Sequence, residues 1–269
     1  MVDVAANFGG SMPEYYDRIM GPGQFDVFAA DLARRLPVKP AGDVLEIACG
    51  TGILTRRLRE RLDRGVRLMA TDISKAMLDY ARGKLAAIPG IEWREADAAS
   101  LPFTDGTFGA VVCAFGVMFV PDKEKLFGEM RRVLREGGLL LFNVWDGLDA
   151  NPHSRTTGEL FEQIFPGDPE MRFRGPFAFN DRTVLRSLLD GARLREERME
   201  PVRNEVRFPS ARELATGQLR GTPRGALLEK RGLALEPIID RCAAALAKVG
   251  GEAPFRGSAQ ALVIEARAV

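Results

Sequence analysis

The sequence predicts a single α/β domain built on a mostly parallel sheet. Short apolar runs bounded by glycine, proline or aspartate alternate with amphipathic segments of about 10 to 15 residues. This alternation is typical of βαβ units, whose parallel strands are covered on both faces. The length of 269 residues suits one large domain or two small ones, and no internal repeat or low-complexity linker divides the chain.

Each expected strand is an apolar run between turn residues, and the run at 110–115 has the composition of a strand buried on both faces. The expected strands are 44–47, 66–71, 91–95, 110–115, 139–145, 194–208 and 259–266. Each expected helix has apolar residues at helical spacing, often after a proline or serine and before a glycine or proline. The expected helices are 13–36 with a break at Gly21-Pro22-Gly23, 53–63, 74–87, 122–135, 152–165, 181–190 and most of 210–249.

Composition excludes several classes of protein. Charge nearly cancels, with 38 basic against 37 acidic residues, so no overall field would hold the chain on nucleic acid or an anionic membrane. Three widely spaced cysteines make a disulfide framework or zinc site improbable and fit a reduced cytoplasmic setting. The one histidine excludes a multi-histidine metal site. We expect no metal, no signal peptide and no membrane span, because the longest apolar run, 109–120, is too short.

A glycine-rich turn follows the first expected strand. Ala48-Cys49-Gly50-Thr51-Gly52 lies directly between an apolar strand and a helix. Glycine lets ligand atoms approach the backbone, and the helix N-terminus offers free N–H groups to an anion. A plain turn also uses glycine, but this position favours a nucleotide-like ligand at the carboxyl edge of the sheet.

Two aspartates end the next two strands. Asp72 lies 20 residues after Gly52, the distance at which an acidic residue typically accepts hydrogen bonds from ribose hydroxyls. The alternative role, a helix N-cap, suits Ser74 better. Asp97 ends the third strand, where its carboxylate is suited to the exocyclic amine of adenine and the Ala98 N–H to a ring nitrogen. A turn aspartate is the alternative there.

A nicotinamide dinucleotide is disfavoured. The third glycine of the G-x-G-x-x-G pattern is absent, because Ile53-Leu54-Thr55 follows Gly52. Tyr80 and Lys84 have the Tyr-x-x-x-Lys spacing of short-chain reductases, but they lie too early in the chain to reach a nicotinamide. We interpret Tyr80 as a packing residue.

These motifs together resemble those of the class I S-adenosylmethionine-dependent methyltransferases, and in particular the ubiquinone/menaquinone-type small-molecule group. The resemblance rests on four segments: 44–52 (Val-Leu-Glu-Ile-Ala-Cys-Gly-Thr-Gly), Asp72 with Asp97, 101–111 and 133–140. It covers residues 13–145 well and departs at Ala48, where glycine is commoner. It implies a Rossmann-like fold: a seven-stranded, mostly parallel sheet with helices on both faces and an antiparallel last strand.

The resemblance implies S-adenosylmethionine as cofactor. The residues it implies for cofactor binding are Tyr16, Glu46, Ala48, Gly50, Thr51, Gly52, Asp72, Ile73, Met77, Asp97, Ala98 and Phe115. Carbonyls near Ala48 and Phe115 would meet the amino group of the methionine moiety. Ile73 and Met77 would pack on the adenine, although core filling is an equal alternative for Met77. Tyr16 belongs to an N-terminal lid, in which packing is the alternative role.

His153 is the candidate catalytic residue. It follows the fifth strand at the carboxyl edge, where a general base would assist a hydroxyl, ammonium or carbon acid. A structural histidine that faces solvent or the cap is the alternative. No nucleophilic catalytic set is expected, because methyl transfer is an in-line displacement that depends on positioning.

The expected organisation is a lid at 1–36, a cofactor-binding core at 37–150, a substrate cap at 151–258 that includes the sixth strand, and the last strand at 259–269. Within the cap, residues 172–224 hold 12 arginines, no lysine and seven acidic residues. With Phe165, Phe173, Phe177, Phe179 and Phe208, they suggest an apolar pocket with an arginine at its mouth for an anionic or aromatic acceptor. A solvated amphipathic surface is the alternative for this segment. For the arginine excess of the whole chain, a codon-usage bias is favoured over arginines that pair with an anionic substrate.

The function we expect is methyl transfer from S-adenosylmethionine to a small-molecule acceptor by a cytoplasmic monomer or homodimer. Nucleic acid and membrane are not expected as partners. Two alternatives stay open: a tRNA or other nucleic-acid methyltransferase that uses the arginines as a phosphate footprint, and a non-catalytic nucleoside sensor.

Overall fold

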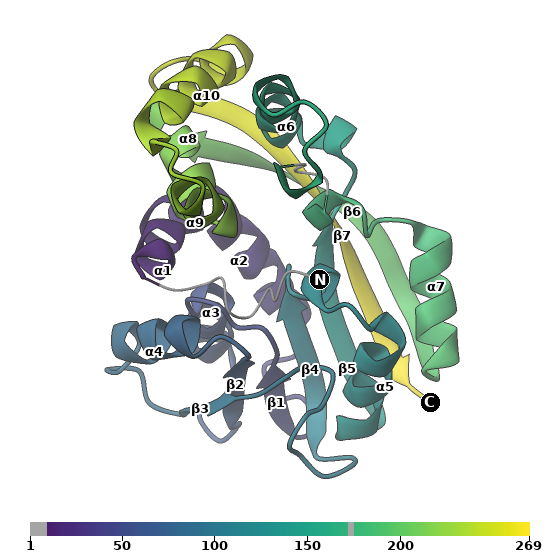
Figure 1. Ribbon diagram of the computed structural model, residues 1–269. Coiled ribbons are helices and arrows are strands. Elements are labelled where there is room, and N and C mark those ends of the chain that lie inside the picture. Colours follow the sequence, from purple (N-terminus) through teal and green to yellow (C-terminus); the bar gives the residue numbers. More distant parts are fainter. Residues whose placement is uncertain (1–9, 172–174) are drawn as a thin grey trace.

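The computed structural model describes residues 10–171 and 175–269 and contains one seven-stranded sheet with the order β3-β2-β1-β4-β5-β7-β6 (Figure 1). The strands are β1 (Asp43–Glu46), β2 (Leu68–Asp72), β3 (Ile91–Glu95), β4 (Phe108–Ala114), β5 (Leu134–Trp145), β6 (Leu194–Phe208) and β7 (Phe255–Ala268). The first five strands are parallel to one another, whereas β7 is antiparallel to both β5 and β6. The expected fold class, with its antiparallel last strand, is confirmed.

Alternate residues of the central strands enter separate cores on the two faces of the sheet. On β4, Ala110 and Val112 pack with α2 (Asp26–Arg35) and α3 (Ile53–Arg61). Val111 and Cys113 pack on the other face with α5 (Lys123–Val133) and α7 (Arg182–Gly191). The period of two side chains therefore explains why this strand is apolar throughout. A third, smaller core lies under α4 (Lys75–Lys84).

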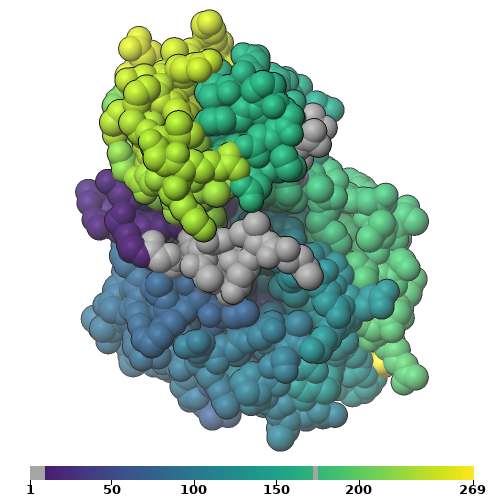
Figure 2. Space-filling view, viewed as in Figure 1, coloured from purple at the N-terminus to yellow at the C-terminus, as the bar shows by residue number. Residues whose placement is uncertain are grey.

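The remaining helices gather beyond the carboxyl edge of the sheet. We call α6 (Pro152–Ile164), α8 (Ala211–Arg220), α9 (Pro223–Lys230) and α10 (Leu235–Gly250) the cap helices. The long strands β6 and β7 run out of the sheet toward them (Figure 1), and Figure 2 shows the cap helices as a separate lobe over the core. Short helical turns are η3 (Val117–Phe119), η4 (Leu148–Ala150), η5 (Pro169–Met171) and η6 (Gly175–Phe177).

The expected break at Gly21-Pro22-Gly23 is wrong. The chain passes without interruption from α1 (Met12–Tyr15) through a π-helix, η2 (Tyr16–Phe25), into α2. The wider π turns accommodate a proline that lacks a donor. The glycines serve packing instead: a Cβ at Gly23 would lie 2.2 Å from the Phe208 ring.

Two strand boundaries also differ from expectation. β5 begins at Leu134, before the Gly137-Gly138 pair that was expected to end the preceding helix, because Leu134 already pairs with Phe108 of β4. β7 begins at Phe255, since it pairs with β6 along its whole length. No helix in the described ranges is long and apolar enough to span a bilayer.

Arg59 fixes the loop between α3 and β2. Its buried guanidinium donates to the carbonyl oxygens of Val66 at 2.6 Å, Leu62 at 2.8 Å and Asp63 at 2.5 Å. Arg59→Met would remove this donor from the three carbonyls, of which Asp63 O keeps a hydrogen bond from Val66 N at 3.1 Å. We therefore expect the free energy of unfolding to fall by about 2 kcal/mol. Urea denaturation measures it, with exposed Arg64→Met as the matched control; an equal, small effect of both substitutions would contradict this role.

Candidate active site

The turn after β1 leaves an opening at the carboxyl edge of the sheet. Gly50 and Gly52 adopt positive φ angles of 55° and 77°, conformations that glycine tolerates best. A Cβ placed on Gly50 would meet no described atom within 4 Å, whereas one on Gly52 would lie 2.9 Å from Leu85 at the end of α4. Gly52 therefore serves close packing, and Gly50 borders open space that a ligand can approach.

Ala48 adopts the same left-handed conformation without being glycine, with φ 52°. Such backbone strain occurs preferentially at functional sites. The position of Ala48 also explains why residue 116, after β4, is glycine. A Cβ on Gly116 would lie 2.5 Å from the Ala48 Cβ and 2.7 Å from Cys113 Sγ. The turn after β1 and the end of β4 thus pack directly on each other.

Asp72 holds the glycine-rich turn to the start of α4. Its two carboxylate oxygens accept hydrogen bonds from Gly50 N and Ser74 N, each at 2.8 Å. Burial raises the pKa of Asp72. Ser74 is the N-cap of α4, as expected, because its Oγ accepts from Met77 N at 3.4 Å. Each oxygen of Asp72 keeps one lone pair for a further donor.

Three buried polar atoms around this turn have no hydrogen-bond partner among the described residues. They are Glu46 Oε2 at the end of β1, Thr51 Oγ1 in the turn and Asn143 Nδ2 on β5. Buried polar atoms are normally paired, so unpaired ones beside a turn call for donors and acceptors from a ligand. The residues present therefore fit a polar cofactor such as S-adenosylmethionine.

Burial raises the pKa of Glu46 to about 8 from its ordinary 4.5. Between these values the folded protein keeps a proton that the unfolded chain releases, so stability decreases as the pH rises through this window. The slope reaches about 1.4 kcal/mol per pH unit. We expect Glu46→Gln to flatten this dependence and to raise stability most at about pH 8.

Denaturation in urea at about pH 5, 6.5 and 8 measures the effect without cofactor. Exposed Glu124→Gln is the control. A Glu46→Gln variant that loses stability between pH 5 and 8 as steeply as the wild type would contradict the buried, neutral Glu46.

Asn143, which was not among the expected site residues, holds the end of β4. Phe115 has φ 54°, and its N–H donates to Asn143 Oδ1 at 2.9 Å. Asn143 is the one polar residue in the apolar run 139–145 of β5 and is fully buried. A single amide side chain in an apolar strand could have identified Asn143 as a site residue, because a buried amide needs a specific hydrogen-bond partner.

A group of contacting aromatic rings extends from Phe115 to the N-terminal helix. Phe115 stacks on Trp145 with centroids 3.9 Å apart, and Trp145 stacks on Phe177 at 5.9 Å. Phe25 lies 5.6 Å from Phe115 and 4.9 Å from Tyr16. We call these five residues the aromatic group. It joins β4, β5, η2 and η6 at the carboxyl edge.

Tyr16 lies close enough to Asp72 for the two to interact. Burial raises the pKa of Tyr16, and the negative charges of Asp72 and Asp17 add to this effect. The same helix is tied to α4 by Asp17, which accepts from Tyr80 at 3.3 Å and from Lys84 at 2.5 Å. Tyr80 and Lys84 therefore hold the N-terminal helix in place.

The other residues expected at the cofactor lie in varied surroundings. Ile73 is 48% exposed, whereas Met77 is buried. Asp97 is exposed, and its Oδ1 accepts from Ala99 N at 2.8 Å, which is the turn role weighed as its alternative. Ala98, beside it, is half-buried.

His153 is buried at the start of α6, with 1% of its surface exposed. Its Nε2 lies 3.0 Å from Gln24 Oε1 of η2, and its Nδ1 has no partner among the described residues. Burial lowers the pKa of His153 to about 4, so the ring is neutral near pH 7. The alternative was a structural histidine that faces solvent or the cap; the ring does not face solvent, because it is buried against Gln24 of η2.

The phenylalanines expected to line one cap pocket do not gather. Phe177 joins the aromatic group, Phe165 lies beside Phe161, and Phe208 lies 6.3 Å from Phe255. Phe179 contacts Lys123, and Phe173 lies outside the described residues. They disperse because they belong to separate helices and strands that pack in different places.

Most described arginines of 172–224 are neutralised by carboxylates on the surface. Arg186, Arg195, Arg198, Arg207, Arg212 and Arg220 all pair in this way. The solvated surface therefore accounts for most of this arginine-rich segment. In the described ranges, no three His, Cys, Asp or Glu side chains are grouped closely enough to hold a metal ion.

Comparison with known proteins gives a consistent picture. Residues 44–138 match a family model described as a methyltransferase domain. The ubiquinone/menaquinone biosynthesis C-methyltransferase UbiE of Marinomonas sp. (strain MWYL1) is 32% identical over 177 residues, which cover 64% of this chain and 68% of that protein. The demethylmenaquinone methyltransferase of Thermus thermophilus is 44% identical over 115 residues, 42% of this chain and 50% of that protein.

The chain spans 57% of another such relative, the demethylmenaquinone methyltransferase of Lysinibacillus sphaericus. Among solved structures, a geranyl diphosphate C-methyltransferase from Streptomyces coelicolor A3(2) has a TM-score of 0.53 at 18% identity, covering 90% of this chain and 76% of that one. The [4+2]-cyclase SpnF has a TM-score of 0.57 at 17% identity, covering 90% and 80%. These structures share the fold, which by itself does not fix the reaction.

Proposed function

The chain belongs to the class I S-adenosylmethionine-dependent methyltransferases, and on this basis we propose that it methylates a small, flat molecule at the carboxyl edge of its sheet. The observation that carries the proposal is the set of unpaired buried polar atoms around the open glycine-rich turn. A turn without a ligand would not retain them, because each one destabilises the folded state.

We propose that the turn at Ala48–Gly52 receives the methionine end of the cofactor, beside Glu46 and Phe115. Asp72 accepts the ribose hydroxyls with its remaining lone pairs, and Ile73 and Met77 flank the adenine. Asp97 and Ala98 bind the adenine edge, for which Asp97 retains its second carboxylate oxygen. Tyr16 closes the site from the N-terminal lid, a role supported by its interaction with Asp72.

The bound cofactor supplies an activated methyl group, so the chain's own work is to position the acceptor and exclude water. The aromatic group suits that task, because its rings form an apolar surface at the end of β4 from which water is excluded. We propose His153 as the group that takes a proton from the acceptor. Its low pKa keeps the ring in the neutral form that a base requires.

The acceptor is proposed to be aromatic or anionic. The curated relatives named above act in quinone biosynthesis by their names, and a planar ring would stack against the aromatic group. A cytoplasmic location, as monomer or homodimer, suits three buried free cysteines, which persist in a reducing environment.

Transfer of labelled methyl groups tests this function. The purified chain is incubated with methyl-labelled S-adenosylmethionine and, separately, with phenols, quinols, aryl carboxylates and total tRNA. We expect label in one class of small molecule. Label in tRNA alone would replace the proposal with the nucleic-acid alternative, and cofactor binding without any transfer would favour the sensor.

A further inference from the structure

The one histidine of the chain is held by an amide rather than by a carboxylate. His153 is buried in the first turn of α6, and its Nε2 lies 3.0 Å from Oε1 of Gln24, which is buried on η2. Two bare acceptors at this distance would repel each other, so the hydrogen between them lies on Nε2. Because the pKa of His153 is lowered to about 4, the neutral ring carries this proton alone near pH 7.

The other ring nitrogen, Nδ1, is consequently a bare lone pair inside the protein. It has no hydrogen-bond partner among the described residues. The carbonyl group of Ser258 on β7 raises the pKa of the ring, an effect smaller than that of burial, but it forms no hydrogen bond with Nδ1. Buried polar atoms are normally paired, so Nδ1 is suited to a hydrogen that a ligand brings.

The surroundings of the ring are uncharged. In the part of the chain that the structure describes, no charged side chain contributes to the pKa of His153. A carboxylate in place of Gln24 would stabilise the imidazolium form and raise this pKa. The amide selects the position of the proton without adding charge, so the ring stays neutral.

Gln24 lies beside the aromatic group. The next residue along η2, Phe25, contacts Phe115 and Trp145, with ring centroids 5.6 and 5.8 Å apart. π-Helical turns occur frequently at functional sites. The Gln24–His153 pair therefore adjoins the place where the acceptor is proposed to stack.

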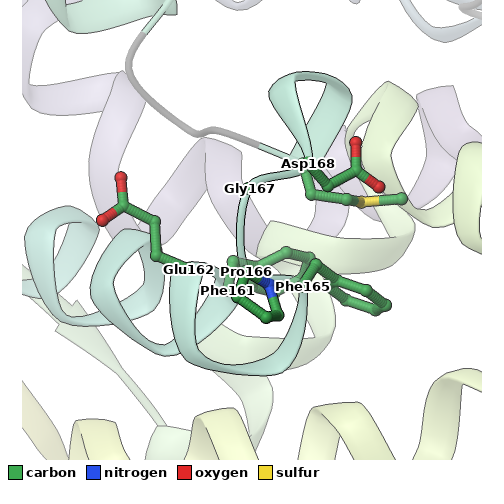
Figure 3. Close-up of a pocket in the computed structure, with 7 residues that line it drawn as sticks. Phe161, Glu162, Phe165, Pro166, Gly167 and Asp168 are labelled. Atoms are coloured by element: carbon green, nitrogen blue, oxygen red, sulfur yellow. The ribbon is translucent and has the colours of Figure 1, made fainter.

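The cavity in Figure 3 lies at the opposite end of α6. It has a volume of about 330 Å³, and Phe161, Glu162 and Asp168 are among the residues that line it. His153 belongs to the first turn of α6 and Phe161 to the last, roughly 12 Å further along the helix axis. The cavity and the buried histidine are therefore separate places.

We propose that Gln24 is a positioning residue that keeps the proton of neutral His153 on Nε2, so that Nδ1 is the atom that takes the proton of the acceptor. This rests on the proposed function and specifies how its base is oriented. As the acceptor atom gains the methyl group, and the carbon–sulfur bond breaks with its electron pair left on sulfur, the proton of the acceptor passes to Nδ1. The ring then carries a proton on each nitrogen, and the second proton leaves to water after the product.

Nuclear magnetic resonance of the full chain measures the tautomer directly. Because His153 is the one histidine, labelling with ¹⁵N-histidine gives a single pair of ring nitrogen resonances, and long-range couplings to the ring hydrogens show which nitrogen is protonated. Near pH 7 and without cofactor, we expect the proton of the wild type on Nε2. In Gln24→Met the Nε2 proton loses its acceptor, so the ratio of Nε2–H to Nδ1–H should fall about 10- to 100-fold.

Gln218→Met is the matched control. Gln218 is also a buried glutamine, but its Oε1 accepts from Thr157 Oγ1 at 2.6 Å, one turn further along α6. This variant should leave the tautomer unchanged. In the labelled-methyl assay, Gln24→Met should lower kcat by about tenfold or more at a similar KM, because a ring protonated on Nδ1 cannot accept a second proton there.

The results separate this proposal from the proposed function. A wild-type proton on Nδ1, an unchanged ratio in Gln24→Met or an equal shift in Gln218→Met would overturn the positioning role. A wild-type kcat in a variant whose tautomer has shifted would overturn it too. These resonances need no cofactor, whereas failure to bind S-adenosylhomocysteine would contradict the proposed function. If Gln24→Met does not fold, Gln24→Leu takes its place, and the wild-type tautomer is decisive in either case.

Discussion

Asp72→Asn should weaken the binding of S-adenosylhomocysteine by about 100-fold. The carboxylate of Asp72 accepts from Gly50 N and Ser74 N at 2.8 Å each. An asparagine must turn its NH₂ group toward one of these donors, so the glycine-rich turn loses a hydrogen bond. The proposed pairing with the ribose hydroxyls is weakened at the same time.

Isothermal titration with S-adenosylhomocysteine measures this change. Asp79→Asn is the matched control, because Asp79 is exposed on α4 and pairs only with Lys75 among the described residues. Its affinity should equal that of the wild type. Equal affinity in Asp72→Asn would place the cofactor elsewhere.

His153→Ala should lower kcat/KM by about 100-fold while leaving cofactor affinity unchanged, the usual scale for a lost general base. His153→Gln separates chemistry from structure. Glutamine can still donate to Gln24 Oε1, which His153 Nε2 approaches to 3.0 Å, but it cannot accept a proton from the acceptor. Both variants should therefore be impaired if the base role is correct.

The pH profile gives a second criterion. The pKa of His153 is lowered to about 4, so the neutral ring exists at every pH above that value. The rate should consequently stay constant from neutral pH down to about 5 and fall below it. Full activity in His153→Gln, or an acid limb near pH 6.5, would remove His153 from the chemistry.

The fold could be predicted from the sequence because its signals are local. The apolar run at 110–115, the Ser74 cap and the turn at 48–52 each fix an element through neighbouring residues. The continuous helix through Gly21-Pro22-Gly23 could not be predicted from local sequence. Gly23 is needed because the ring of Phe208, a residue far along the chain, leaves no room for a side chain there.

The candidate site divides in the same way. Asp72 and the glycines follow strand ends, so their meeting at one edge follows from parallel topology. The hydrogen bond from Phe115 to Asn143 and the contact of His153 with Gln24 join segments distant in sequence. The edge-on contact of Phe25 with Phe115 and the stacking of Phe115 on Trp145 likewise depend on packing that no local pattern records.

The most direct test of the account is a side-by-side titration of the wild-type chain with S-adenosylhomocysteine and NAD. The central claim is that the glycine-rich turn at Gly50, which Asp72 holds in place through a hydrogen bond, binds the methyl donor. The account predicts saturable binding of S-adenosylhomocysteine and no measurable binding of NAD up to about 1 mM. Tighter binding of NAD than of S-adenosylhomocysteine would contradict it.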